Sequence, residues 1–150
     1  MNRVFVFWLL FAVLSVPSFA VHVAVLETIS SHNALGLSER QYLTDELRAQ
    51  AVNALPAELN FTIMTRENII AMLPPGKSIE ECEGSCLVET GKNISADYVA
   101  QGRVGRFGKD LTLTVELYET AGAKLVGSFT AKSADAEGLL ESVKSQSPGL

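Results

Sequence analysis

The chain is poor in the residues that most often carry chemistry. Among its 150 residues are two cysteines, two histidines and one tryptophan, and its 12 lysines and arginines are outnumbered by 17 aspartates and glutamates. The formal net charge of -5 leaves no basic excess to neutralise phosphates, so the composition argues against a nucleic-acid-binding protein. A chain of this length is expected to form a single domain.

Long hydrophobic runs are absent beyond residue 20, so no transmembrane span is expected in the mature chain. The one apolar run covers residues 4–16 and follows a basic residue, Arg3. Two small residues, Ser18 and Ala20, follow the run in the positions that a signal peptidase prefers. A membrane-spanning helix takes about 20 apolar residues, so this run is too short to be an anchor. We predict that residues 1–20 form a cleaved secretory signal.

The two cysteines, Cys82 and Cys86, are spaced as CxxxC around Gly84. An exported protein meets an oxidising compartment, where two nearby thiols usually bond, and the glycine allows the chain to turn between them. We predict a structural disulfide between Cys82 and Cys86. A redox-active pair would have CxxC spacing, and a zinc site would need two further ligands, which His22 and His32 do not supply at metal-ligand spacing. Neither a metal nor a cofactor is expected.

The pattern of apolar residues predicts five strands and four helices. The strands cover residues 21–26, 60–65, 98–107, 111–118 and 124–131. The helices cover residues 39–55, residues 66–72, a third segment through Leu87 to about residue 94, and a last segment capped by Asp135 or Ser133.

This order, strand-helix-strand-helix-helix-strand-strand-strand-helix, predicts a mixed α/β (α+β) fold. We expect one five-stranded mixed sheet with helices mainly on one face. The first two strands are joined by a helix, so they should pair in parallel and lie in the middle of the sheet. The last three are joined by short turns and should form an antiparallel meander. The domain is expected to span residues 21–144, with residues 145–150 as a frayed tail.

The start of the first helix carries a capping signal. Residues 38–41 read Ser-Glu-Arg-Gln, which matches a capping box, and Leu37 and Tyr42 are placed to form a hydrophobic staple. We therefore predict that this helix begins at Glu39. Its apolar face is expected to carry the following residues: Leu43, Leu47, Ala51, Val52 and Leu55.

Residues 111–118 alternate strictly between apolar and polar side chains, as in a strand with one buried face. The apolar face should lie under helices. The polar face should be in contact with water and carries four residues: Thr112, Thr114, Glu116 and Tyr118.

The last third of the chain resembles a known family. Residues 95–104 read Ser-Ala-Asp-Tyr-Val-Ala-Gln-Gly-Arg-Val and are followed by a turn glycine, Gly108, by the alternating strand and by Gly122. This pattern resembles the amino-terminal domain of TolB and its relatives, which include the curli secretion channel CsgG. Ser95 stands where the family usually has glycine, and Ala121 interrupts the usual Thr-Gly pair.

The resemblance implies a mixed α/β fold in an exported protein of the bacterial envelope. It implies no catalytic residue and no cofactor, because the family domain has none to carry over. We therefore expect a non-enzymatic, periplasmic protein-interaction domain in envelope assembly or integrity, with envelope proteins as partners. Peripheral association with the outer membrane is a variant of this location.

The last predicted strand has a neighbour on one side only, so its free edge and the polar sheet face are the expected partner-binding surface. This surface would include the four polar residues of the preceding strand together with Lys124, Val126, Ser128 and Thr130. Arg103, Arg106 and Lys109 form a basic tip that is either solvated or in contact with an acidic partner or lipid head groups.

An alternative function is the sensing or binding of a small periplasmic molecule. Its pocket would lie between the first helix and the loop of residues 30–37, where His32 is placed. A hydrolase is a weaker hypothesis, because Ser128 and Ser133 have no histidine near them in the sequence.

Overall fold

The computed structural model describes residues 19–76 and 84–150. Its helices and strands follow the predicted order. In chain order, with three short 3-10 turns (η), they are β1 (Val21–Ser30), η1 (Ser31–Asn33), α1 (Leu37–Ala54), η2 (Ala57–Leu59), β2 (Phe61–Ile63), α2 (Arg66–Met72), α3 (Ser85–Asn93), β3 (Tyr98–Phe107), β4 (Asp110–Glu119), β5 (Lys124–Ser133), α4 (Ala136–Gln146) and η3 (Ser147–Gly149).

Five strands form one sheet in the order β2-β1-β3-β4-β5. β1 runs parallel to both β2 and β3, whereas β3, β4 and β5 pair antiparallel. The predicted fold class, a mixed five-stranded sheet, is confirmed. The expectation that the first two strands both lie in the middle is wrong for β2. This strand has three residues and forms an edge, because the longer β3 takes the other side of β1.

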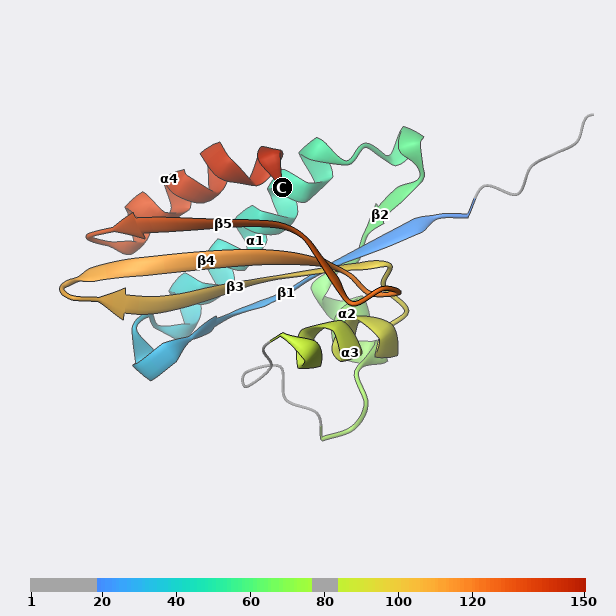
Figure 1. Ribbon diagram of the computed structural model, residues 1–150, viewed down its shortest axis with the longest axis horizontal. Helices are drawn as coiled ribbons and strands as arrows, with labels where there is room; N and C mark the ends of the chain where they lie inside the picture. The colour runs from blue at the N-terminus through green and yellow to red at the C-terminus, as the bar shows by residue number, and fades with distance from the viewer. Residues whose placement is uncertain (1–18, 77–83) are drawn as a thin grey trace, which may run out of the picture.

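Helices α1 and α4 cover one face of the sheet, and the smaller helices α2 and α3 cover part of the other (Figure 1). The larger core, under α1 and α4, contains Val25, Ala34, Leu35, Leu43, Leu47, Ala100, Val104, Leu111, Leu113, Val115, Ala131, Leu139 and Val143. The smaller core, under α2 and α3, contains Ala24, Leu26, Met64, Ile69, Leu87, Ile94, Ala96 and Val99. Neighbouring residues of β1 enter different cores, so this strand is buried on both faces.

Helix α1 begins earlier than its capping signal predicts. Gly36 is the N-cap, and its N–H donates to Oε2 of Glu39 at 2.8 Å. The predicted capping box at residues 38–41 is therefore wrong, because the Glu39 carboxylate pairs with the N-cap residue Gly36. Leu37 and Tyr42 are both exposed, so they do not form the predicted staple.

The apolar face of α1 also differs at one position. Val52 is 57% exposed, whereas Thr44 is fully buried. Thr44 can be buried on this face because its hydroxyl accepts the N–H of Thr28 at 2.8 Å and lies 2.9 Å from the Thr28 hydroxyl. A buried polar side chain is stable here because it is hydrogen-bonded.

An irregularity in β1 produces this contact. The pairing of β1 with β3 shifts in register between Leu26 and Ile29. Gly102 of β3 lies beside the shift, and a Cβ atom at this position would be 3.0 Å from Oγ1 of Thr28 and 3.3 Å from Cδ1 of Leu113. A glycine is therefore placed where β1 and β4 side chains approach the backbone most closely.

Glu27, the first residue inside the irregularity, holds α1 and α2 to β1. Its Oε1 lies 3.0 Å from Nη2 of Arg48 and 2.7 Å from Nε of Arg66. Asp45 Oδ1 lies 2.7 Å from Nη2 of Arg66, which closes the group. Partial burial opposes ionisation of Glu27, but the hydrogen bonds from Arg66 and Arg48 outweigh it, so the pKa of Glu27 is lowered from its ordinary value of 4.5.

Ala96 and Asp97, which belong to the pattern that resembles the TolB family, make hydrogen bonds that connect three strands. Oδ2 of Asp97 accepts the N–H of His22, and the N–H of Asp97 donates to the carbonyl oxygen of His22, both at 2.8 Å. The hydroxyl of Thr120 donates to the carbonyl oxygen of Ala96 at 2.6 Å. These bonds join the start of β1, the start of β3 and the end of β4.

The last residues pack against the domain, so the predicted frayed tail at 145–150 is wrong. Asp135 caps α4 by accepting the N–H of Gly138 at 2.9 Å, and the helix continues to Gln146. Leu150 then packs on the larger core. Gly127 of β5 leaves room for Leu150, because a Cβ atom at this position would be 2.9 Å from the carbonyl oxygen of Leu150.

Some predictions concern residues that the structure does not describe. The signal peptide lies mainly within residues 1–18, and Cys82 lies within residues 77–83, both outside the described parts of the chain. Its predicted partner, Cys86, is a half-buried residue of α3.

We predict that Glu27→Gln lowers the free energy of unfolding by about 2 kcal/mol at pH 7, because the three hydrogen bonds that Arg48 and Arg66 donate lose their charged acceptor. Denaturant unfolding measures this. The loss should shrink as the pH falls below 4.5, because the stability supplied by a lowered pKa disappears as the folded-state carboxylate takes up a proton. Glu141→Gln, which removes the carboxylate of the exposed Glu141–Lys144 pair, should change stability by less than about 0.5 kcal/mol. Equal effects of the two variants would contradict the assigned role.

We predict that Gly91→Ala in α3 lowers the free energy of unfolding by about 1 to 3 kcal/mol, despite the better helix propensity of alanine. The added Cβ would be 2.6 Å from Cγ2 of Thr120 and 3.1 Å from Cβ of Val99. Thr120 is fixed by its hydrogen bond to Ala96. Gly105→Ala is the control, because its Cβ would meet only Oγ1 of Thr112 at 3.6 Å. Thermal unfolding of the three proteins compares them, and a stable Gly91→Ala protein would show that this contact relaxes.

Candidate functional site

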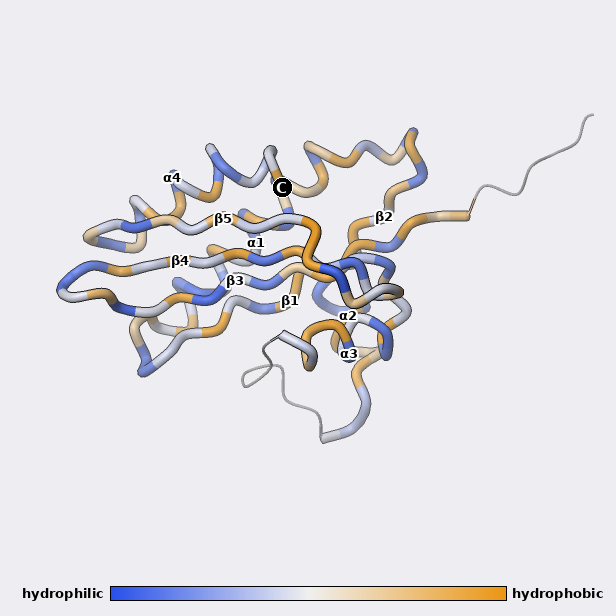
Figure 2. The backbone as a smooth tube through the Cα atoms, viewed as in Figure 1, coloured by the Kyte–Doolittle hydropathy of each residue, from blue (hydrophilic) through white to orange (hydrophobic). Residues whose placement is uncertain are grey.

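The polar residues of β4 lie together on the face of the sheet opposite α1 and α4. Thr112, Thr114, Glu116 and Tyr118 are half-buried, whereas Leu111, Leu113 and Val115 on the other face are buried. Figure 2 shows polar and apolar positions along β4. The alternation read from the sequence thus places these four side chains on one surface, called here the open face.

Two neighbouring strands extend the open face. Thr114 is in register with Arg103 of β3 and with Thr130 of β5, and its Oγ1 lies 3.3 Å from Oγ1 of Thr130. Glu116 is in register with Gln101 and with Ser128. The open face therefore presents hydroxyl and charged groups across three strands, whereas the Gln101 amide is buried and donates to the carbonyl oxygen of Glu27.

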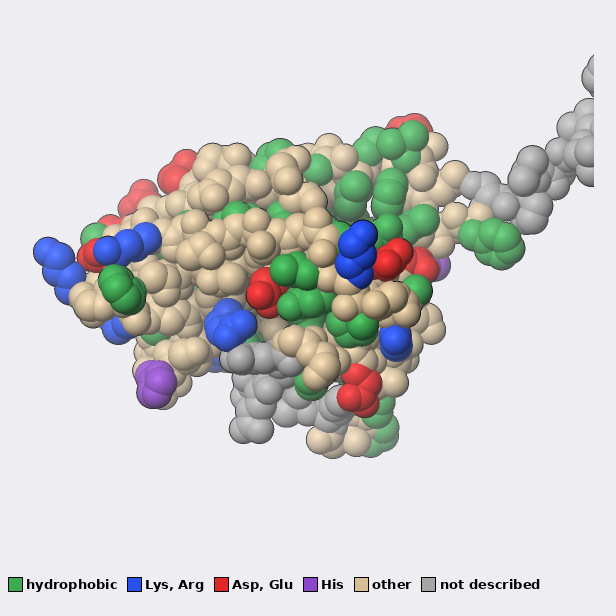
Figure 3. Space-filling model, in the orientation of Figure 1, with side chains coloured by type: hydrophobic (Ala, Val, Ile, Leu, Met, Phe, Trp, Pro, Cys, Tyr) green, Lys and Arg blue, Asp and Glu red, His purple; other side chains and the backbone are tan. Residues whose placement is uncertain are grey.

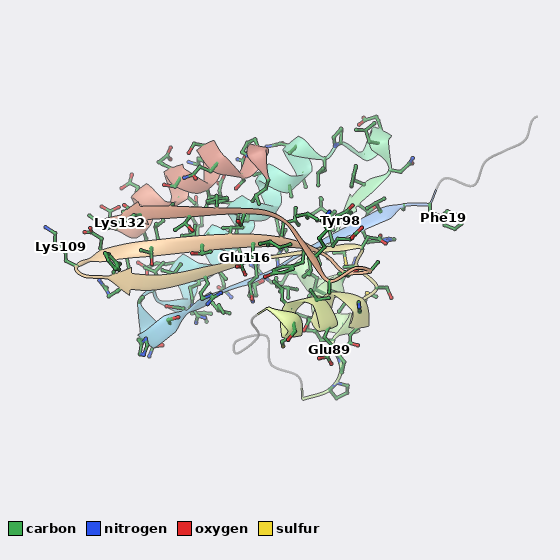
Figure 4. The ribbon with its side chains drawn as sticks, viewed as in Figure 1. Phe19, Glu89, Tyr98, Lys109, Glu116 and Lys132 are labelled. Carbon is green, nitrogen blue, oxygen red and sulfur yellow. The ribbon has the colours of Figure 1, made fainter. Side chains whose placement is uncertain are left out.

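Glu116 lies near the middle of this face (Figure 4). Its Oε2 accepts the hydroxyl of Tyr118 at 3.4 Å and lies 3.9 Å from Nη2 of Arg103. Burial and the negative charge of Glu116 raise the pKa of Tyr118, whose hydroxyl donates to this carboxylate. Arg103 belongs to this group, so its predicted place in the basic tip is wrong.

β5 is the edge of the sheet in the described part of the chain, because β4 is its only neighbour there. The predicted contact residues Lys124, Val126, Ser128 and Thr130 are all exposed. The structure therefore brings the eight predicted residues onto one continuous region, formed by β4 and β5. A lysine stands at each end of β5, and Lys132 makes an ion pair with Asp110 at 2.9 Å.

A bulge in β5 adds a residue that the sequence pattern missed. Leu117 pairs with Gly127 and Tyr118 pairs with Leu125, which leaves Val126 without a partner residue. Leu125 is 45% exposed and Val126 is 42% exposed. Strict alternation puts Leu125 on the buried face, but the bulge places it opposite Tyr118. Gly127 was the available signal, because glycine within a strand often marks a bulge.

Figure 3 shows apolar side chains gathered on this side of the molecule, near the turn between β4 and β5 and beside α3. The opposite end of the strands is basic. There Phe107 is 72% exposed, and Nζ of Lys132 lies 5.5 Å from its ring centre. Lys109 occupies the turn between β3 and β4 (Figure 4). The open face thus has an apolar end and a basic, aromatic end.

The alternative hypothesis places a small-molecule pocket near His32. His32 is exposed in η1. A groove of about 410 Å³ does lie at the start of α1, but its other wall is α4 rather than the loop of residues 30–37. It is lined by Ser38, Glu39, Tyr42, Leu43, Ala136, Glu137 and Leu140.

Within residues 19–76 and 84–150, no three side chains of histidine, cysteine, aspartate or glutamate are grouped so that they could hold a metal ion. None of the helices described is long and apolar enough to cross a membrane.

Comparison of the sequence with protein-family models gives no match, and no curated protein matches it either. Solved structures do share the fold. The LpoB C-terminal domain from Salmonella enterica matches with a TM-score of 0.57 and 17% identity, over 79% of this chain and 87% of that chain. The lipoprotein GNA1162 from Neisseria meningitidis matches with a TM-score of 0.53 and 13% identity, over 83% and 91%.

TolB from Acinetobacter baumannii also matches, with a TM-score of 0.45 and 13% identity, over 87% of this chain and 29% of that chain. The matches to LpoB and GNA1162 show that the chain shares their fold, while membership of the TolB and CsgG family stays a prediction.

We predict that the exported chain contains a Cys82–Cys86 disulfide. The purified native protein should resist alkylation of its thiols until a reductant is added. Reduction, or Cys86→Ser, should lower the free energy of unfolding by about 2 kcal/mol, because the closed loop is short. Mass spectrometry after alkylation reads the thiol state directly. Two freely alkylated thiols in the folded, exported protein would rule the bond out.

Proposed function

We propose that this chain is a non-enzymatic, periplasmic protein-interaction domain that binds another envelope protein through β5 and the adjoining open face. The observation that carries the proposal is the exposed edge of β5 (Lys124–Ser133), a ten-residue strand paired on one side in the described structure. An edge strand presents backbone N–H and C=O groups that a partner strand can pair with.

The bulge makes one end of this edge suitable for recognition. Leu125 and Val126 are exposed beside Tyr118, and burying apolar area of this kind supplies about 25 cal/mol per Å². The lysines at the two ends limit pairing with an arbitrary strand, because charged side chains on an edge oppose non-specific sheet extension. A partner with an acidic residue near either lysine would overcome this restriction.

The open face supplies specificity. Glu116 and Thr114 can accept hydrogen bonds from a partner, while the hydroxyl of Tyr118 donates to Glu116 and holds its carboxylate in place. A partner strand that pairs with β5 would bring its own side chains next to Ser128 and Thr130. Both residues border this polar row.

The proposed location rests on two further observations. The first twenty residues have the composition of a secretory signal. The fold is shared with the LpoB C-terminal domain and with a neisserial protein described as a lipoprotein. The same proposal includes membership of the TolB and CsgG family and a role in envelope assembly or integrity. A more specific version places the protein at the outer membrane by peripheral attachment.

The test is site-specific photo-crosslinking in the native cell. A photoreactive amino acid replaces Ser128 on β5 or, as a matched exposed position on α1, Val52. We expect Ser128 to capture one dominant envelope protein and Val52 not to capture it. Adding Val126→Asp to the Ser128 probe should lower the yield about tenfold, as expected for a central apolar contact.

Circular dichroism and thermal unfolding of each variant show that the chain is folded. If folded protein with the Ser128 probe captured nothing, or if Val126→Asp left the yield unchanged, binding through the β5 edge would be wrong. Capture of the same protein from Val52 alone would move the interface to the helical side of the sheet.

A further inference from the structure

An apolar cavity lies on the helical side of the sheet, away from the open face. Its volume is about 210 Å³. Val23 and Val25 from β1, Leu47 and Ala51 from α1, Leu117 from β4, and Leu150 form much of its wall. The end of the chain lies close to the end of α1 in Figure 1, and η3 contacts α1. The segment that follows α4 therefore forms one side of the cavity, which is partly open to solvent.

One polar side chain belongs to this wall. Ser147 is 9% exposed, and its Oγ is buried with no hydrogen-bond partner among the described residues. A buried hydroxyl normally has a partner, because it has given up its hydrogen bonds to water. An unsatisfied hydroxyl in an otherwise apolar wall matches a bound molecule that is mostly apolar and has one polar group.

We propose that this cavity binds a small neutral amphiphile: a short alkyl chain or a single ring that carries one hydroxyl or carbonyl group. The size fits, because an apolar cavity of about 150 Å³ accommodates benzene. The charge also fits, because none of the described side chains lining the cavity is ionisable. An ionised carboxylate would have no cation to pair with and would lose its hydration.

The cavity lies on the side of the larger core, whereas the proposed partner surface lies on the opposite face and the β5 edge. The inference therefore stands independently of the proposed function.

The experiment is a titration of the purified exported chain with straight-chain primary alcohols from butanol to decanol, followed by amide chemical shifts in NMR spectra. We expect shifts concentrated at Leu47, Ala51 and Ser147. Affinity should rise about fourfold for each added methylene until the cavity is full, and should then stop rising. If no alcohol shifted these amides, or if affinity rose without limit as in surface adsorption, the site would be disproved.

Two pairs of variants identify the site. Ser147→Ala should weaken alcohol binding about fivefold by removing the hydrogen-bonding group, while Ser145→Ala, whose exposed hydroxyl donates to the Ser142 carbonyl, should leave it unchanged. Ala51→Leu should abolish binding by filling the cavity, while Val52→Leu on the exposed side of α1 should not. If Ala51→Leu does not fold, the Ser147 pair decides alone. Equal affinity of Ser147→Ala and the unaltered protein would overturn the proposal.

Discussion

The break in β1 at Glu27 and Thr28 is the constraint on which the positions of the helices depend. At this point the strand leaves its register with β3 and directs two consecutive side chains to different partners. Glu27 contacts Arg48 and Arg66, while Thr28 is hydrogen-bonded to Thr44. Removing one partner from such a partly buried charge group costs more than the pair itself contributes, because the remaining charge is left incompletely neutralised. One irregular dipeptide thus positions both α1 and α2 against the sheet.

Much of the fold could be predicted from the sequence, because its signals are local. The pattern of apolar residues, together with capping residues, located the strands and helices of the described parts of the chain, and Asp135 caps α4 as predicted. The errors arose where a distant contact decides the outcome. β2 is an edge because β3 pairs with β1, and the last residues are packed because Gly127 leaves room for Leu150. No local pattern encodes either contact.

The candidate binding surface was likewise predicted only in part. Alternation along residues 111–118 identified the polar row of β4, and the antiparallel order identified β5 as its outer neighbour. Leu125 was missed because a bulge reverses the alternation there. The cavity could not be predicted at all, since its wall combines three strands, one helix and the segment after α4. Its single polar residue, Ser147, has no distinguishing sequence context.

The sheet combines contacts of very different span, and this has a kinetic consequence. β3, β4 and β5 are joined by short turns, so they can assemble as hairpins in about microseconds. β1 can join them only by closing a much longer loop, since the bond from His22 to Asp97 links positions 75 residues apart. Until that happens, β3 is an unprotected edge like β5. A chain in which β1 has not yet joined the sheet would have two open edges, and self-association would then compete with the arrival of its own first strand.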